Sequence, residues 1–83
     1  MDSADLIVYA TTWCGDCRRA RAFLERHQIP HTWIDVDQDK EAEALVRRWN
    51  NGNRSVPTLV FPDGSRLVEP SDAALAEKFG LPV

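Results

Sequence analysis

Cysteine, methionine and long apolar runs are all scarce in this chain of 83 residues, which has two Cys and one Met. Two cysteines are too few for a closed zinc site within one chain. No apolar run is long enough to cross a bilayer. The first five residues are neither basic nor continuously apolar, so we expect no ordinary signal peptide. These absences favour a cytoplasmic protein with no membrane partner and no bound metal.

Basic residues are also few: the chain has 10 basic and 13 acidic residues, which give a net charge of −3. No basic patch dominates, so a nucleic-acid partner is not expected. The chain has no internal repeat, low-complexity tract or linker. Its length allows one small domain over residues 1–83, and its 43% hydrophobic content suffices for one compact core. We expect a monomer.

Hydrophobic periodicity predicts four strands and three helices. Apolar and β-branched segments predict strands at 5–10, 31–36, 58–61 and 66–68. Helical spacing predicts helices from about Arg18 to just before Pro30, over 39–50, and from a cap at Ser71 to about Phe79. The helical crossover makes the first two strands parallel. The pattern β-α-β-α-β-β-α is that of an α/β domain, with a four-stranded mixed sheet and helices on both faces.

Both cysteines lie in one motif, Trp13-Cys14-Gly15-Asp16-Cys17, between the first strand and the first helix. A helix N-terminus stabilises a thiolate placed there, and strand, C-x-x-C and helix in this order indicate thiol–disulfide exchange. Cys14, at the cap, is the predicted nucleophile. Cys17 falls on the apolar stripe of the helix and is predicted to face the core and to resolve a mixed disulfide. The plain alternative is a cysteine pair that merely packs.

A second element, Ser55-Val56-Pro57-Thr58, opens the third strand. Proline there lacks an N–H and suits a cis bond, which would leave the Val56 backbone free to pair with an extended cysteinyl substrate. An ordinary trans proline that starts a strand is the alternative.

With these two motifs in place, the chain resembles the glutaredoxins, and among them the actinobacterial mycoredoxins. The resemblance runs from about Leu6 to Phe79. It is carried by three stretches: Tyr9-Ala10-Thr11-Thr12-Trp13-Cys14-Gly15-Asp16-Cys17, Asn51-Gly52-Asn53-Arg54-Ser55-Val56-Pro57-Thr58, and Asp63-Gly64-Ser65 with Pro70-Ser71. It implies a thioredoxin fold and the reduction of mixed disulfides between proteins and a small thiol.

The resemblance also implies roles for individual residues. Cys14 attacks the mixed disulfide, and Cys17 can close an intramolecular disulfide. The predicted substrate-binding residues are Thr12, Trp13, Arg54, Val56, Pro57, Ser71 and Asp72. For Trp13, a hydrophobic lip and plain packing against the loop stay open, and Arg54 has a solvated loop position as its alternative. No cofactor is implied, since the small thiol is a co-substrate, and S-thiolated client proteins are the partners.

Two positions depart from the family pattern. Glutaredoxins commonly carry a lysine that helps to bind a glutathione carboxylate where this chain has Thr11, so the sequence favours a sugar-based thiol such as mycothiol over glutathione. Asp16 stands where relatives have an aromatic residue. Its carboxylate disfavours a thiolate at Cys14, and Arg18 is predicted to offset it.

The sequence therefore predicts a thiol–disulfide oxidoreductase of the mycoredoxin type. One alternative is a dithiol donor that thioredoxin reductase reduces and that serves an enzyme such as ribonucleotide reductase. The other is a glutaredoxin that binds an iron–sulfur cluster. Trp33 and Trp49 are predicted core residues, His27 lies on the apolar stripe of the first helix, and neither His27 nor His31 is expected to be a general base.

Overall fold

A computed structural model describes residues 6–82, and it has the seven elements in the predicted order. They are β1 (Ile7–Ala10), α1 (Gly15–Arg26), β2 (Thr32–Asp35), α2 (Lys40–Trp49), β3 (Thr58–Val60), β4 (Arg66–Val68) and α3 (Asp72–Phe79). The predicted β-α-β-α-β-β-α pattern is confirmed. The expected start of the first strand at Asp5 lies outside the described residues.

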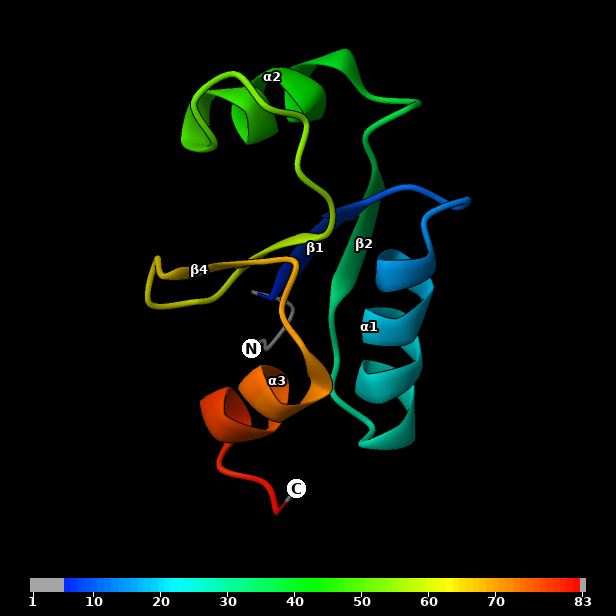
Figure 1. Cartoon of the computed structure of the whole chain (residues 1–83), viewed down its shortest axis with the longest axis vertical. Helices are drawn as coiled ribbons and strands as arrows, with labels where there is room; N and C mark the ends of the chain where they lie inside the picture. Colours follow the sequence, from blue (N-terminus) through cyan, green and yellow to red (C-terminus); the bar gives the residue numbers. More distant parts are fainter. Residues whose placement is uncertain (1–5, 83) are drawn as a thin grey trace.

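The four strands form one mixed sheet in the order β2-β1-β3-β4 (Figure 1). β1 and β2 are parallel, with Ile7 opposite Thr32. β3 runs antiparallel to β1, with Val8 opposite Leu59. β4 runs antiparallel to β3. The parallel pair follows from the helical crossover between its strands.

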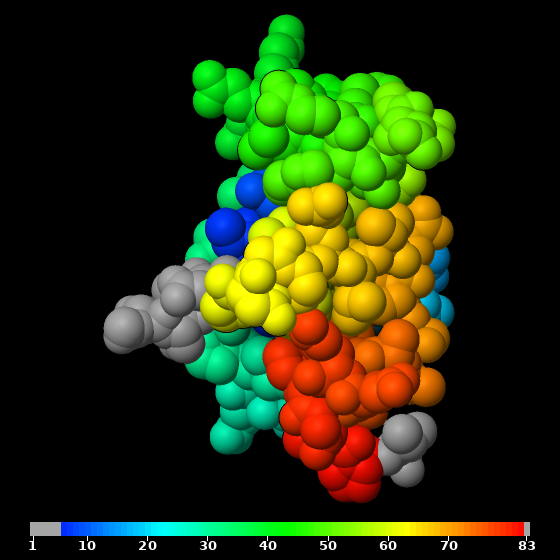
Figure 2. All heavy atoms as spheres, turned by 90° about the vertical axis from the view of Figure 1, so that its left-hand side faces the viewer, coloured from blue at the N-terminus to red at the C-terminus, as the bar shows by residue number. Residues whose placement is uncertain are grey.

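Alternation along the strands gives the sheet two buried faces. One face packs against α1 and α3. The core between them contains strand residues such as Val8, Ala10 and Leu59 and helix residues such as Cys17, Leu24 and Leu75. The opposite face packs against α2 and holds Tyr9, Val36, Ala42 and Val46. Successive strand residues point to opposite faces, so Val8 and Tyr9 belong to different layers. Figure 2 shows the β3–β4 hairpin at the surface between α2 and α3.

Each helix begins at a side chain that accepts a backbone hydrogen bond. The Asp39 carboxylate accepts from the Ala42 N–H and the Ser71 hydroxyl accepts from the Ala74 N–H, as capping residues do. α1 begins at Gly15, three residues before the predicted start, because the sulfur of Cys14 is its N-cap. None of the helices within residues 6–82 is long and apolar enough to cross a membrane.

Three expectations about burial need correction. Trp33 and Trp49 are only partly buried; the guanidinium of Arg21 lies over Trp33 and that of Arg66 lies over Trp49. Both indoles therefore pack against the edge of the core with a charged side chain covering them. His27 is exposed at the C-cap of α1, where its ring lies 4.4 Å from that of Phe23.

Candidate active site

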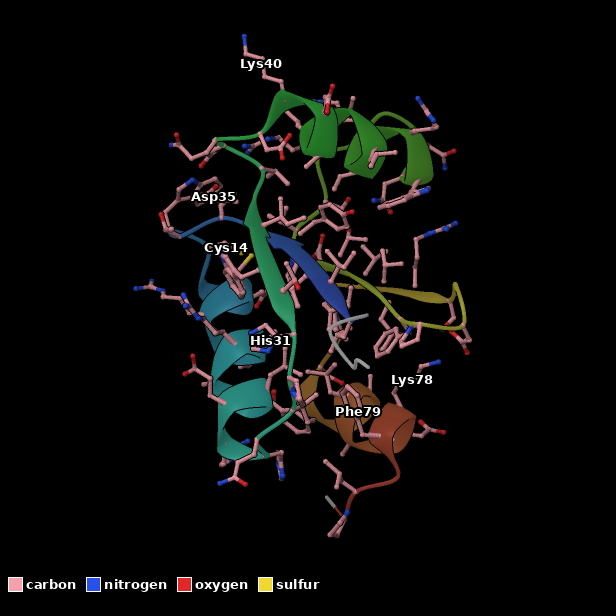
Figure 3. All side chains as sticks on the ribbon, turned by 180° about the vertical axis from the view of Figure 1, so that it is seen from behind. Cys14, His31, Asp35, Lys40, Lys78 and Phe79 are labelled. Carbon is pink, nitrogen blue, oxygen red and sulfur yellow. The ribbon has the colours of Figure 1, made fainter. Side chains whose placement is uncertain are left out.

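Cys14 lies where β1 leads into α1, with its sulfur at the amino end of the helix (Figure 3). The Sγ atom accepts a hydrogen bond from the backbone N–H of Cys17 at 3.2 Å. The side chain is partly exposed. Free N–H groups and the helix dipole concentrate positive potential at this point. The fold therefore presents a partly exposed sulfur at the positive end of a helix.

Cys17 lies one turn further along α1 and is completely buried among core side chains. Burial, together with the neighbouring Cys14, raises the pKa of the Cys17 thiol from 9.0 to about 12. Backbone and hydroxyl groups of Thr11 act in the opposite direction but do not outweigh burial. Both cysteines are free thiols. At neutral pH, Cys17 is therefore a protonated, shielded thiol beside an accessible sulfur.

The segment before β3 forms the other side of the site. The Val56–Pro57 peptide bond is cis, as the sequence predicts. Pro57 is buried and Val56 is half-buried. The Val56 carbonyl oxygen lies 3.9 Å from Cys14 Sγ, although 42 residues separate the two in the chain. The fold thus brings the two predicted motifs together, with the backbone of Val56 facing the Cys14 sulfur.

Trp13 forms an exposed rim next to Cys14, with 62% of its surface accessible. Its indole N–H donates to Asp37 Oδ2 at 2.8 Å. Arg54 forms ion pairs with Asp37 and, at 2.8 Å, with Glu43. Trp13 is thus held by a hydrogen bond and Arg54 is paired with carboxylates, while the substrate-binding roles of both stay predictions. Thr12 is exposed beside this rim.

The carboxylate of Asp16 is paired with Arg19 at 3.4 Å, although Arg18 was the residue expected to offset part of its charge. The i,i+3 spacing places Arg19 one turn above Asp16 on the same helix face. Arg19 also reaches Asp72 at 3.8 Å and the Pro70 carbonyl at 3.5 Å. These contacts connect the active-site end of α1 to the start of α3.

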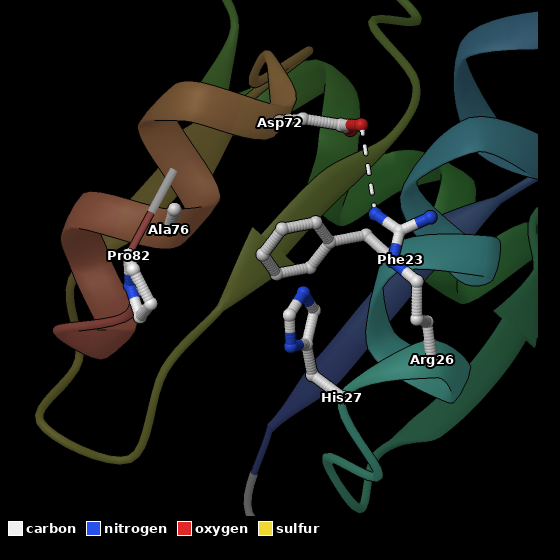
Figure 4. A pocket seen from close by; sticks show the side chains of 6 residues that line it. All are labelled: Phe23, Arg26, His27, Asp72, Ala76 and Pro82. Carbon is white, nitrogen blue, oxygen red and sulfur yellow. Dashed lines mark ion pairs between the residues drawn. The ribbon is translucent and has the colours of Figure 1, made fainter.

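Ser71 and Asp72 occupy the start of α3, as the sequence predicts, but their contacts are with other parts of the fold. The Ser71 hydroxyl caps α3. Asp72 pairs with Arg26 at 3.9 Å at a cavity of about 350 Å³ between α1 and α3, which Phe23, His27, Ala76 and Pro82 also line (Figure 4). Among residues 6–82, the ion pairs of Asp72 are therefore with Arg19 and Arg26 of α1.

Asp37 and Glu43 are the two site residues that the sequence analysis missed. Asp37 follows the end of β2, the strand parallel to the one that leads to Cys14. Carboxyl ends of adjacent parallel strands meet at one edge of a sheet, which is where sites form. That placement is the signal that singles out Asp37. Residues 6–82 contain no group of three or more His, Cys, Asp or Glu side chains suited to a metal ion.

Comparison with known proteins decides the family. The glutaredoxin family model matches residues 6–66. The chain belongs to the glutaredoxin family. A Mycobacterium tuberculosis protein named as a glutaredoxin is 41% identical over 71 residues, which are 86% of this chain and 84% of the relative. Mycoredoxin 1 of Corynebacterium glutamicum is 39% identical over 75 residues, which are 90% of this chain and 92% of that protein.

Solved structures agree on the fold of this glutaredoxin. The crystal structure of a Methanosarcina mazei glutaredoxin superposes with a TM-score of 0.78 at 24% identity, over 98% of this chain and 82% of that one. The fold is therefore thioredoxin-like. Family and fold together make the protein a thiol–disulfide oxidoreductase that works with low-molecular-weight thiols and protein disulfides.

Proposed function

We propose that this glutaredoxin reduces mixed disulfides between proteins and mycothiol, with Cys14 as the nucleophile and as a monomer in the cytoplasm. The observation that carries the proposal is the position of Cys14 Sγ at the N-cap of α1, 3.9 Å from the Val56 carbonyl. A cysteinyl backbone lying along Val56 would bring its disulfide to this sulfur, in the manner of strand addition.

The reaction takes two thiol–disulfide exchanges. The Cys14 thiolate attacks the mycothiol sulfur, a Cys14–mycothiol disulfide forms, and the client sulfur leaves as a thiolate that takes up a proton. A second mycothiol thiolate then attacks the mycothiol sulfur of that disulfide, which releases oxidised mycothiol and restores the Cys14 thiolate. The attacking species is an anion in each step.

In the alternative second step, the Cys17 thiolate would attack the Cys14 sulfur of the Cys14–mycothiol disulfide, release mycothiol as a thiolate and close an intramolecular disulfide. This route requires Cys17 to lose its proton, and its pKa of about 12 opposes that at neutral pH. The high pKa and complete burial of Cys17 therefore support the route in which a second small thiol regenerates Cys14. The same argument weighs against a dithiol donor that thioredoxin reductase would reduce.

Two features support mycothiol as the small thiol. The chain is 39% identical to a mycoredoxin over nearly its whole length. Thr11, where many glutaredoxins carry a lysine, is completely buried, so this position offers no charge to a glutathione carboxylate. A sugar-based thiol lacks those peptide carboxylates and does not need the lysine.

The test is a turnover assay on one model mixed disulfide prepared with mycothiol, glutathione or bacillithiol. We expect the mycothiol adduct to give the highest kcat/KM. Cys14→Ser should abolish turnover. Cys17→Ser should keep at least about half of it, because a second mycothiol from solution, and not Cys17, attacks the Cys14–mycothiol disulfide. Full activity in Cys14→Ser would refute Cys14 as the nucleophile. Loss of activity in Cys17→Ser, with reduction of the wild type by thioredoxin reductase and NADPH, would establish the dithiol donor instead.

A further inference from the structure

The rim of the site contains a hydrogen-bonded group that the exchange chemistry does not use. Asp37 accepts from the Trp13 indole N–H at 2.8 Å through Oδ2 and pairs with Arg54 through Oδ1. Its own backbone N–H donates to Asp35 Oδ1 at 2.9 Å. Asp37 is thus held from three directions, at the point where β2 leads into α2.

Arg54 is fixed equally firmly. Besides Asp37, its guanidinium pairs with Glu43 at 2.8 Å, and Glu43 pairs with Arg47 at 3.2 Å. Only 23% of the Arg54 side chain is exposed. Two carboxylates facing one guanidinium leave little positive charge free at the rim, so Arg54 is poorly placed to attract an anionic substrate.

This network spans both sides of the nucleophile. Trp13 precedes Cys14, and Arg54 lies two residues before Val56, whose carbonyl faces the Cys14 sulfur. The polar edge of Trp13 is occupied by Asp37, yet 62% of Trp13 is exposed. What Trp13 offers to a partner is therefore its apolar ring, held in one orientation, and such preorganisation spares the cost of ordering a side chain on binding.

We propose that Asp37 is a positioning residue of this reductase: it holds the Trp13 ring at the rim of Cys14 and keeps Arg54 paired, so that the rim favours an uncharged, hydroxyl-rich thiol over an anionic one. The choice of thiol rests on the proposed function. The hydrogen bond from Trp13, and to a lesser extent that from Arg54, holds the pKa of the Asp37 carboxyl below its usual 3.8. The Asp37–Arg54 ion pair therefore persists throughout the neutral range.

The hydrogen bond itself can be measured without any substrate. Indole N–H signals of a ¹⁵N-labelled protein identify Trp13 as the signal that Trp13→Phe removes. We expect Asp37→Ala to shift that signal and to leave those of Trp33 and Trp49 in place. The matched control is Asp63→Ala, which removes another exposed carboxylate, in the turn between β3 and β4, where it contacts Ser65 and Lys78. An unchanged Trp13 signal in Asp37→Ala would overturn the proposal.

Kinetics then separate positioning from a general structural role. Asp37→Ala and Trp13→Phe should each raise KM for the mycothiol mixed disulfide about fivefold with kcat within about twofold, the scale of ordering one side chain on binding. The double variant Asp37→Ala, Trp13→Phe should have a KM no higher than that of either single variant, because all three variants lack the same hydrogen bond. Asp63→Ala should match the wild type. Additive effects, or an equal loss of kcat in Asp37→Ala, would contradict the proposal.

Selectivity is the remaining readout. We expect Asp37→Ala to lower the ratio of kcat/KM for the mycothiol adduct to that for the glutathione adduct at least about fivefold. Asp37→Asn retains an acceptor for the indole but lacks the charge. Its KM should therefore be close to that of the wild type, while its selectivity should be as low as that of Asp37→Ala. A wild type that prefers glutathione would refute mycothiol as the substrate, whereas an unchanged ratio in Asp37→Ala would refute the role of Asp37.

Discussion

At the scale of single residues, the two cysteines differ through their environments rather than through their chemistry. Both belong to α1 and its cap, and three positions separate them. Cys14 meets solvent and the N–H of Cys17, whereas Cys17 meets only protein. A thiolate is favoured by hydrogen bonds and disfavoured by desolvation. One helical turn therefore suffices to leave one sulfur accessible and to bury the other.

The raised pKa of Cys17 gives a direct prediction. In Cys14→Ser, thiolate absorbance in the ultraviolet should stay flat up to about pH 9, because a pKa near 12 leaves roughly one thiolate per 10⁵ molecules at pH 7. Burial, the largest cause, is unaffected by that substitution. The Cys14→Ser, Cys17→Ser double variant supplies the baseline. A titration midpoint below about pH 8 would mean that Cys17 is not shielded as the structure shows.

At the scale of elements, capping fixes where each helix starts and so where the site residues lie. α2 begins after Asp39, whose carboxylate accepts from the Ala42 N–H at 3.0 Å. Glu41 and Glu43 occupy its first turn and Arg47 and Arg48 its last, as the helix dipole prefers. Because α2 carries Glu43, the start of this helix also determines where Arg54 is anchored.

We predict that Asp39→Ala lowers the free energy of unfolding by about 1 kcal/mol, the usual value of an N-cap side chain. Asp39→Ser should keep most of that stability, because a hydroxyl also accepts from the first-turn N–H groups. Urea unfolding followed by circular dichroism measures both. If alanine and serine prove equally destabilising, the cap hydrogen bond is not the cause.

At the scale of the whole molecule, a single sheet separates two small cores, and the candidate active site lies at one end of it. α1 and α3 cover one face and α2 the other. β3 is central and β4 is an edge strand. Leu59 and Leu67 are paired across these two strands, yet Leu59 is completely buried and Leu67 only partly. These two leucines, although paired in the sheet, should therefore contribute different amounts to the free energy of unfolding.

Leu59→Ala should cost about 3 kcal/mol of unfolding free energy, since a fully buried leucine leaves a cavity. Leu67→Ala should cost about 1 kcal/mol, because β4 is exposed on one side. A chain of this length has a total stability of roughly 4–12 kcal/mol, so Leu59→Ala alone removes a large part of it. Chemical denaturation of the two variants in parallel makes the comparison, and equal losses would contradict the burial seen here.

The element order, the cap position of Cys14, the burial of Cys17 and the cis bond before Pro57 were all predictable from the sequence. Each depends on local rules: strand and helix periodicity, dipole and cap chemistry, and the preferences of proline. The exact start of a helix was harder to predict. α1 begins earlier than expected because a cysteine sulfur is its cap.

Only the tertiary structure decided which distant groups meet. Asp37 reaches Trp13 across 24 positions and Val56 reaches Cys14 across 42, and no local pattern encodes either contact. Arg19 rather than Arg18 pairs with Asp16 because the helix face, and not nearness in the sequence, sets the partner. The sequence by itself thus determined that the Cys14 sulfur caps α1 and which elements surround it. The packing of those elements decided the rim beside Cys14, since its hydrogen bonds exist only once separate segments are brought together.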